Sequence, residues 1–210
     1  MNKIIRISPA EGNMFSVSWI IHLKCNYDCM YCPPDRHTNE SDMKSLEDLK
    51  RYWQEIFDQT KHLNKLYKFS ISGGEPTVNK NLILFLEWLR SEFGQHFKMI
   101  GITTNGSAST QYYLKLFSLV DFIAFSTHSE HIQVDRFFES AQALAKYAKE
   151  NNKSFNVNIM QEFWATDAIT DYVARCKEHE IYHSFSEIDY KKQTRTIPIF
   201  KNKKDDTANS

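Results

Sequence analysis

The chain has 210 residues, of which 41% are hydrophobic and 25% are charged, and its formal net charge is zero. This length and composition are typical of a globular domain with one sizeable core. A net charge of zero provides no general attraction to nucleic acid or to an anionic membrane surface, so we expect neither as a partner. The apolar run at residues 15–23 contains polar residues and is far too short to cross a membrane.

The N-terminal stretch MNKIIRISPAEGNMF also lacks the unbroken apolar segment of a signal peptide. A cytoplasmic location is therefore expected. Disulfides are disfavoured in the cytoplasm, where clustered cysteines more often bind a metal or take part in catalysis.

Short β-rich segments alternate with longer amphipathic segments along the chain. We expect strands at residues 16–23, 67–72, 98–103, 120–126, 154–160 and 183–188. Apolar residues at helical spacing predict helices at residues 45–59, 80–93, 110–119, 133–150 and 166–179. Strands separated by helices pair in parallel, so the pattern predicts an α/β fold. Periodicity alone fits either a doubly wound open sheet or an incomplete barrel.

We expect a single core domain over residues 1–200, because no linker rich in Gly, Pro or Ser interrupts the alternation. Residues 201–210, KNKKDDTANS, are polar and show no periodicity. We expect them to form a disordered tail. Met99 and Met160 fall inside expected strands, where a place in the core is the ordinary expectation for methionine.

Three of the four cysteines, Cys25, Cys29 and Cys32, follow the first expected strand with the spacing C-x3-C-x2-C. In both candidate architectures, chemistry gathers at the carboxyl ends of the strands. Three thiolates there indicate either a zinc site completed by His37 or an iron–sulfur cluster with one iron left open. The remaining cysteine, Cys176, lies on the apolar face of an expected helix and is predicted to be a small buried hydrophobe.

Unusual residues also follow the later strands. The second strand leads into GGEP at residues 73–76, where paired glycines permit a sharp turn and a close approach to a ligand. The third strand leads into TNG at residues 104–106. The ends of the last three strands carry His128, Glu162, Trp164 and Asp189, whose roles the sequence leaves open.

Taken in chain order, these motifs resemble those of the radical S-adenosylmethionine (radical SAM) superfamily. The matching features are the three cysteines with Tyr31 before the last one, the GGEP turn, and TTNG at residues 103–106. The resemblance extends over residues 14–188 and implies a partial (β/α)6 barrel. It also implies that the cysteines bind a [4Fe–4S] cluster whose open iron binds SAM. Reductive cleavage of SAM would then give a 5′-deoxyadenosyl radical that abstracts a hydrogen from a substrate.

The resemblance further implies which residues contact SAM. The backbone of the GGEP turn would meet the methionine part, while Glu75 would either accept from its ammonium group or hold the loop. Tyr31 would shield the cluster or flank the adenine, and polar side chains of later strands would meet the ribose. The expected cofactor-binding residues are Tyr31, Gly73, Gly74, Glu75, Pro76, Thr104, Ser126 and Asn158, and the expected metal ligands are Cys25, Cys29 and Cys32.

An enzyme of this kind needs an electron donor such as a flavodoxin or a ferredoxin. Its substrate could be a small molecule, a nucleotide or a peptide, and the reaction class is open between oxidoreductase, transferase and lyase. A glycyl-radical-enzyme activase acting on a partner protein is an alternative with the same chemistry. A zinc-stabilised binding module without catalysis is the alternative from another class.

Overall fold

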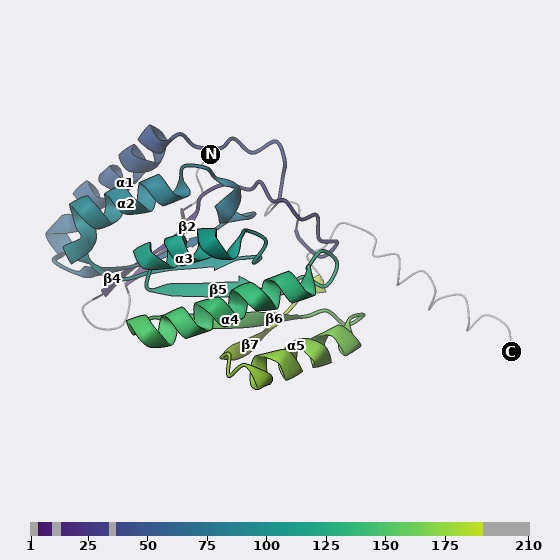
Figure 1. Cartoon of the computed structure of the whole chain (residues 1–210). Coiled ribbons are helices and arrows are strands. Elements are labelled where there is room, and N and C mark those ends of the chain that lie inside the picture. Colours follow the sequence, from purple (N-terminus) through teal and green to yellow (C-terminus); the bar gives the residue numbers. More distant parts are fainter. Residues whose placement is uncertain (1–3, 10–13, 34–36, 191–210) are drawn as a thin grey trace, which may run out of the picture.

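The computed structural model describes residues 4–9, 14–33 and 37–190, which form one seven-stranded sheet covered by helices (Figure 1). The strands are β1 (Ile4–Pro9), β2 (Met14–Ile20), β3 (Leu66–Ser72), β4 (Phe97–Thr104), β5 (Phe122–Ser126), β6 (Ser154–Gln161) and β7 (His183–Glu187). The α-helices are α1 (Leu46–Thr60), α2 (Leu82–Phe93), α3 (Thr110–Leu119), α4 (Val134–Asn151) and α5 (Thr166–Glu178). Three short 3-10 helices are η1 (Lys61–Leu63), η2 (Pro76–Val78) and η3 (Gly94–His96). Among the described residues, no helix combines the length and apolar character needed to cross a membrane.

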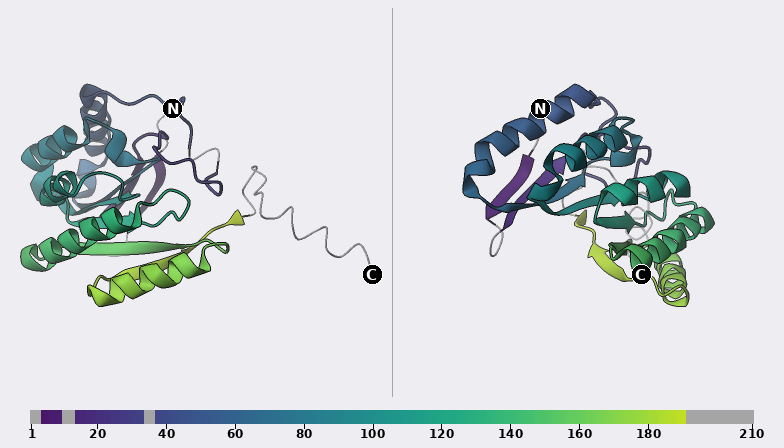
Figure 2. Two further views of the ribbon diagram at one scale, coloured as in Figure 1. Left: turned by 45° about the vertical axis from the view of Figure 1, so that its right-hand side comes forward. Right: turned by 60° about the vertical axis from the view of Figure 1, so that its left-hand side comes forward.

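The strands lie in the sheet in chain order, and β2 to β7 run parallel. A doubly wound sheet reverses its strand order at a switch point, whereas a sequential order belongs to a barrel. Figure 2 shows the sheet curved, with the helices wrapped around its outer side. The expected partial (β/α)6 barrel is therefore confirmed, with all six predicted strands and all five predicted helices present.

Strand β1 was not predicted. It pairs antiparallel with β2 at the edge of the sheet and ends at Pro9. Its sequence, IIRISP, ends in a proline, which ordinarily counts against a strand except at an edge. The predicted tail at residues 201–210 lies outside the described residues.

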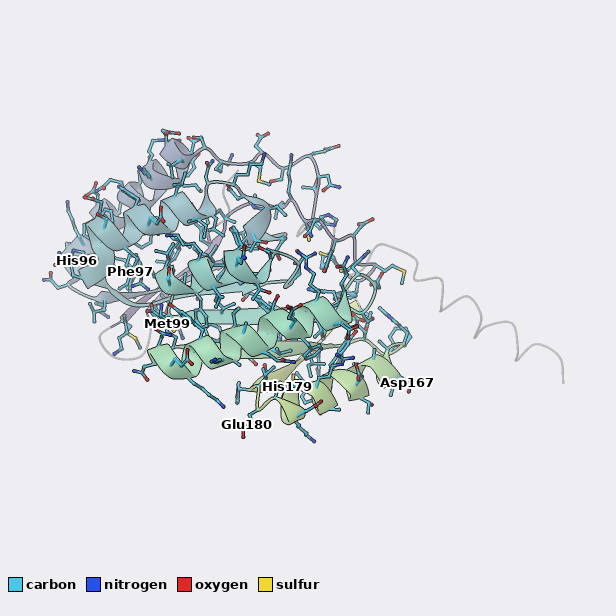
Figure 3. All side chains as sticks on the ribbon, in the orientation of Figure 1. His96, Phe97, Met99, Asp167, His179 and Glu180 are labelled. Carbon is cyan, nitrogen blue, oxygen red and sulfur yellow. The ribbon has the colours of Figure 1, made fainter. Side chains whose placement is uncertain are left out.

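Local signals in the sequence explain where the helices begin. Ser45 caps α1, since its side chain accepts a hydrogen bond from the Asp48 N–H at 3.1 Å. In Figure 3, Phe97 marks the start of β4 at one end of the molecule, and Asp167 marks the start of α5 at the other. The helices thus return the chain to the end where the next strand begins.

Bulky side chains on the outer face of the sheet pack against the helices. Val17, Phe69 and Ile100 are paired neighbours on β2, β3 and β4, and each is fully buried. Trp53 of α1 packs on Phe69, with ring centroids 4.9 Å apart. The core of the molecule therefore lies between the outer face of the sheet and the helix layer.

The inner face of the same strands carries small and polar side chains. Ser18, Ser70 and Gly101 are paired neighbours across β2, β3 and β4. Ser126, Asn158 and Ser184 form a second such row across β5, β6 and β7. A complete α/β barrel fills its interior with layers of bulky side chains. Here most of the inner residues are only half-buried, so the inside of the partial barrel is an open, polar trough.

Candidate functional site

A cavity of about 400 Å³ lies at the carboxyl ends of the parallel strands. Its walls come from the loop after β2 and from the ends of β3 to β7. Ten of the eleven site residues predicted from the sequence line it, namely Cys25, Cys29, Tyr31, Cys32, Gly73, Gly74, Glu75, Thr104, Ser126 and Asn158. The eleventh, Pro76, is buried and is the first residue of η2, directly after Glu75 in the chain.

The loop after β2 presents its three cysteines to this cavity. The loop turns back on itself, with the Cys32 N–H donating to the Cys29 carbonyl at 3.0 Å. Burial is the largest cause that raises the pKa of the Cys29 and Cys25 thiols above their ordinary value. Such thiols remain protonated at neutral pH unless a metal cation stabilises the thiolates. The donor set and its burial therefore fit a metal–sulfur group.

His37, the fourth ligand that a zinc site would need, also lines the cavity. Its Nδ1 lies 3.4 Å from the Asp28 carboxylate. Within residues 4–9, 14–33 and 37–190, no three Cys, His, Asp or Glu side chains are close enough to hold a single metal ion. Thiols that surround one cavity but do not converge on one point can instead be bridged by a cluster of several irons.

The GGEP turn is bound to the cysteine loop through its backbone. The Gly74 N–H donates to the His22 carbonyl at 2.9 Å, and the Glu75 N–H donates to the Lys24 carbonyl at 2.8 Å. A Cβ on Gly74 would lie 2.1 Å from the Lys24 oxygen, and one on Gly73 would lie 2.4 Å from the His22 oxygen. The paired glycines are thus required where two backbones approach closely. The backbone contacts expected between this turn and the methionine part of SAM stay a prediction.

Glu75 is buried, and its carboxylate joins the GGEP turn to the TNG segment. Its carboxylate accepts hydrogen bonds from the Thr77 N–H (3.0 Å), the Thr77 hydroxyl (2.6 Å), the Thr104 hydroxyl (2.6 Å) and the Asn105 N–H (2.6 Å). Burial raises the pKa of Glu75, and these hydrogen bonds act in the opposite direction. Of the two roles that the sequence left open for Glu75, holding the loop is the one these contacts perform.

The TNG segment is tied to the cysteine loop by side chains. The Asn105 amide donates to the Asn26 side-chain oxygen at 2.9 Å, and the Asn26 amide donates to the Ser107 hydroxyl at 2.9 Å. The same Asn105 nitrogen lies 4.0 Å from the Cys25 sulfur. No role for Asn26 or Asn105 could be inferred from position alone, because only the fold brings these two segments together.

Two neighbouring threonines at the end of β4 point to opposite faces. Thr104 pairs in register with Phe125 of the outer face, and its hydroxyl is hydrogen bonded to Glu75 and Tyr113. Thr103 is exposed on the inner face and lines the cavity. Side chains two positions apart on a strand point to the same face, so the small residue Gly101 could have predicted that Thr103 also faces the inside of the barrel. Contact between Thr104 and the ribose stays a prediction.

The far wall of the cavity comes from β5, β6 and β7. Ser126 and Asn158 are neighbours in register, and the Asn158 side-chain oxygen accepts from the Ser186 hydroxyl at 2.9 Å. Met160 was expected in the core, but it is half-buried on the inner face and lines the cavity. Met160 directly follows Ile159, which is buried on the outer face. Successive side chains of a strand point to opposite faces, so Met160 points to the inner face and not into the core.

His128, Glu162 and Trp164, which the sequence placed at strand ends without a role, meet around Tyr31. The Tyr31 hydroxyl is hydrogen bonded to His128 Nδ1, and the Glu162 carboxylate and the Cys29 thiol lie near it. Glu162 also accepts from the Ser129 N–H at 3.1 Å and from the Ser129 hydroxyl. Trp164 packs on the Tyr31 ring, with centroids 6.2 Å apart. Burial raises the pKa of Glu162 to about 7 and lowers that of His128 to about 4.

The sequence model of the radical SAM superfamily matches residues 19–160. Curated relatives include the GTP 3′,8-cyclase of Haemophilus influenzae strain PittEE, which is 27% identical over 106 residues, 48% of this chain and 28% of the relative. The GTP 3′,8-cyclase of Desulforamulus reducens is 34% identical over 86 residues, 40% of this chain and 24% of the relative. Each match thus covers less than a third of the relative's own length.

Solved structures share the fold. Streptococcus suis SuiB bound to S-adenosylmethionine has a TM-score of 0.62 and 20% identity, over 91% of this chain and 46% of that chain. The protein anSMEcpe with bound AdoMet has a TM-score of 0.62 and 16% identity, over 82% of this chain and 49% of that chain. The chain thus spans about half the length of these neighbours, both of which were solved with SAM bound.

Proposed function

The chain belongs to the radical SAM superfamily and is an enzyme, and on that premise we propose that it cleaves SAM reductively to begin hydrogen abstraction from a substrate. One observation carries the proposal. The cysteine loop, the GGEP turn and the TNG segment converge on one cavity and are joined by hydrogen bonds of both backbone and side chains.

The thiols of Cys25, Cys29 and Cys32, of which that of Cys29 is buried, would hold a [4Fe–4S] cluster as its three protein ligands. When bound, the cluster supplies the electron that splits SAM into methionine and a 5′-deoxyadenosyl radical, which removes a hydrogen atom from the substrate. Cys29 is only 6% exposed, and a low exposure to solvent is one of the factors that set the potential of such a group. A flavodoxin or a ferredoxin would provide the electron.

SAM would occupy the remaining space of the cavity. The backbone of Gly73 and Gly74, which line the cavity, would meet the methionine part. Ser126 and Asn158, adjacent on the inner face, would meet the ribose hydroxyls, and Tyr31 would flank the cluster. A volume of about 400 Å³ lies near the lower end of the range for pockets that hold drug-sized ligands. The substrate would therefore extend from SAM along the open trough of the inner face.

Metal analysis of anaerobically purified and reconstituted protein tests the cluster. We expect about four irons and four sulfides per chain with a brown chromophore. One zinc and no colour would instead support the non-catalytic binding module. Cys29→Ala should lose the iron, whereas Cys176→Ala, which removes a buried thiol of α5, should retain it. Equal iron in Cys29→Ala and the unaltered protein would contradict the ligand assignment.

A further inference from the structure

Strand β7 forms one edge of the sheet and lacks the features that protect many edge strands. It pairs with β6 on one side, and among the described residues no strand pairs with its other side. The opposite edge strand, β1, ends at Pro9 and has an irregular register between Ile4 and Arg6. Prolines and irregular pairing both hinder the addition of a further strand. Strand β7 has the sequence HSFSE and a regular register, with neither Pro nor Lys, so its edge is open to a partner strand.

The outer face of β7 is also less covered than that of the neighbouring strands. Helices bury the outer side of β2 to β6, and α5 packs against β6. Phe185 pairs in register with Ile159, which is fully buried, yet Phe185 itself is 52% exposed. Tyr182, directly before β7, is 72% exposed. Aromatic side chains are enriched in protein–protein interfaces, so these two rings make the edge a candidate docking surface.

The backbone of β7 shows which residues a further strand would meet. The Val157 N–H donates to the Tyr182 carbonyl at 3.0 Å, and Val157 pairs in register with His183. In a parallel ladder, residues that bond the neighbouring strand alternate with residues whose N–H and C=O groups point the other way. His183, Phe185 and Glu187 therefore direct their backbone groups to the open edge.

The sequence of β7 is complementary to itself. In an antiparallel pair of two β7 strands centred on Phe185, this residue lies opposite its own copy, and His183 lies opposite Glu187. These are pairs that exchange both of their main-chain hydrogen bonds, because their backbone groups face the edge. An aromatic pair and a pair of opposite charges both stabilise neighbouring strands. Ser184 lies opposite Ser186, and both side chains are small.

The neighbouring registers lose this match. A pair centred on Ser186 places Phe185 opposite Glu187, and a pair centred on Ser184 places Glu187 opposite Ile181. Each of these registers sets a carboxylate against an apolar side chain. Ile181 is also buried in its own chain, at 3% exposure. Of the three registers, the one centred on Phe185 therefore provides the favourable partners.

We propose that β7 is the dimerisation edge of this chain, where two copies pair antiparallel about a two-fold axis through Phe185. Opposite side chains of an antiparallel pair lie on the same face of the sheet, so the inner faces of both copies point to the same side. The two troughs then form one continuous surface. Ser186 and Glu187 line the cavity, so His183 of the second copy lies beside the cavity wall. The second copy thus stands at the open side of each site.

Light scattering coupled to size-exclusion chromatography of the full, reconstituted chain tests the dimer. We expect a mass of twice the 24.7 kDa of one chain. Phe185→Lys, which places two like charges on the axis, should give the mass of one chain. Leu84→Lys is the matched control, because Leu84 is 51% exposed on α2, and it should remain a dimer. A wild-type monomer would overturn the proposal and would leave β7 to another occupant, such as residues 191–210 of the same chain. A dimeric Phe185→Lys protein would overturn it as well.

An exchange of charges tests the register. His183→Glu sets two carboxylates opposite each other at both ends of the pair and should raise the Kd of the dimer about tenfold. Adding Glu187→Lys to that variant restores opposite charges and should return the Kd to the wild-type value. Sedimentation equilibrium measures both constants, and a double variant that dimerises no better than His183→Glu would overturn the pairing. The measurement uses no SAM, so a failure of SAM cleavage would refute the proposed function without deciding the dimer.

Discussion

The two faces of one sheet perform different tasks in this molecule. On β3, Phe69 is fully buried beneath α1, while the next residue, Ser70, is half-buried and faces the trough. The same alternation recurs on β5, where Phe125 is in the core and Ser126 lines the cavity. The fold is therefore stabilised from the outside of the partial barrel, and the inside is left for ligands.

The energetic contrast follows from the size of the side chains. Fully burying a Val, Leu, Ile or Phe side chain contributes about 1.5–3 kcal/mol, whereas a serine offers almost no apolar area. A sheet filled on both faces would be more stable but would have no cavity at its strand ends. Changes on the outer face should therefore alter stability, and changes on the inner face should alter ligand binding.

The largest expected effect comes from the outer face. Phe69→Ala should lower the free energy of unfolding by about 3–5 kcal/mol, because it removes a ring that packs against Trp53 and Trp19 and leaves a cavity. Ser70→Ala, one residue along the same strand, should change it by no more than about 0.5 kcal/mol. Urea unfolding of the reconstituted protein measures both. An equal loss of unfolding free energy in the two variants would show that the inner face contributes to stability as much as the outer face does.

Gly74→Ala tests the contact between the GGEP turn and the cysteine loop. An added Cβ would lie 2.1 Å from the Lys24 oxygen, so the backbone must shift, at a cost of about 1–3 kcal/mol. We expect most of the bound iron to be lost as well, because the loop that carries the cysteines is displaced.

Gly94→Ala is the matched control for that change. Its Cβ would meet nothing within 4 Å, and the backbone there is helical. We expect an increase in stability of about 0.4–1 kcal/mol and an unchanged iron content. Full iron in Gly74→Ala would contradict the tight backbone approach.

The buried carboxylate of Glu162 should make stability depend on pH. Its pKa is raised to about 7 in the folded chain from about 4.5 in the unfolded one, so between these values the folded state binds a proton that the unfolded state has released. Stability should therefore fall by about 1–3 kcal/mol as the pH rises from 4.5 to 7. Glu162→Gln should flatten this part of the profile in urea unfolding at a series of pH values. An unchanged profile in the variant would assign the dependence to another group.

The smallest expected effect belongs to a single inner-face hydroxyl. Ser126→Ala should weaken SAM binding about 2- to 10-fold, the loss of one hydrogen bond, with little change in stability. Val157→Ala, on the outer face of the neighbouring strand, should lower stability and leave SAM affinity unchanged. Equilibrium dialysis with labelled SAM measures the affinities. A Ser126→Ala protein that loses stability but binds SAM as tightly as the unaltered protein would show that Ser126 does not contact SAM.

Most of the fold could be predicted because helices cover the outer side of the strands from β2 to β6. Apolar residues at alternate positions of β2 to β6 and at helical spacing in α1 to α5 both point to that arrangement. Strand β1 could not be predicted, because its place depends on long-range pairing with β2 rather than on a pattern within six residues. The boundary of the core domain at residue 200 stays a prediction.

The residues of the site also differ in whether the sequence alone could predict them. The cysteines and the GGEP turn could be identified because each is a short motif with its chemistry contained in adjacent residues. The hydrogen bond between Tyr31 and His128 could not, since these residues are 97 positions apart and meet only when the strand ends converge. The hydrogen bonds of Thr104 and Asn105 to Glu75 depend on the fold for the same reason.

The most direct test of the account is the formation of 5′-deoxyadenosine. The reconstituted protein is incubated anaerobically with dithionite and SAM, and products are quantified by chromatography. We predict that 5′-deoxyadenosine and methionine form in equal amounts, that Cys29→Ala forms neither, and that Cys176→Ala forms both. A protein with about four irons per chain that yields no 5′-deoxyadenosine would contradict the proposed function.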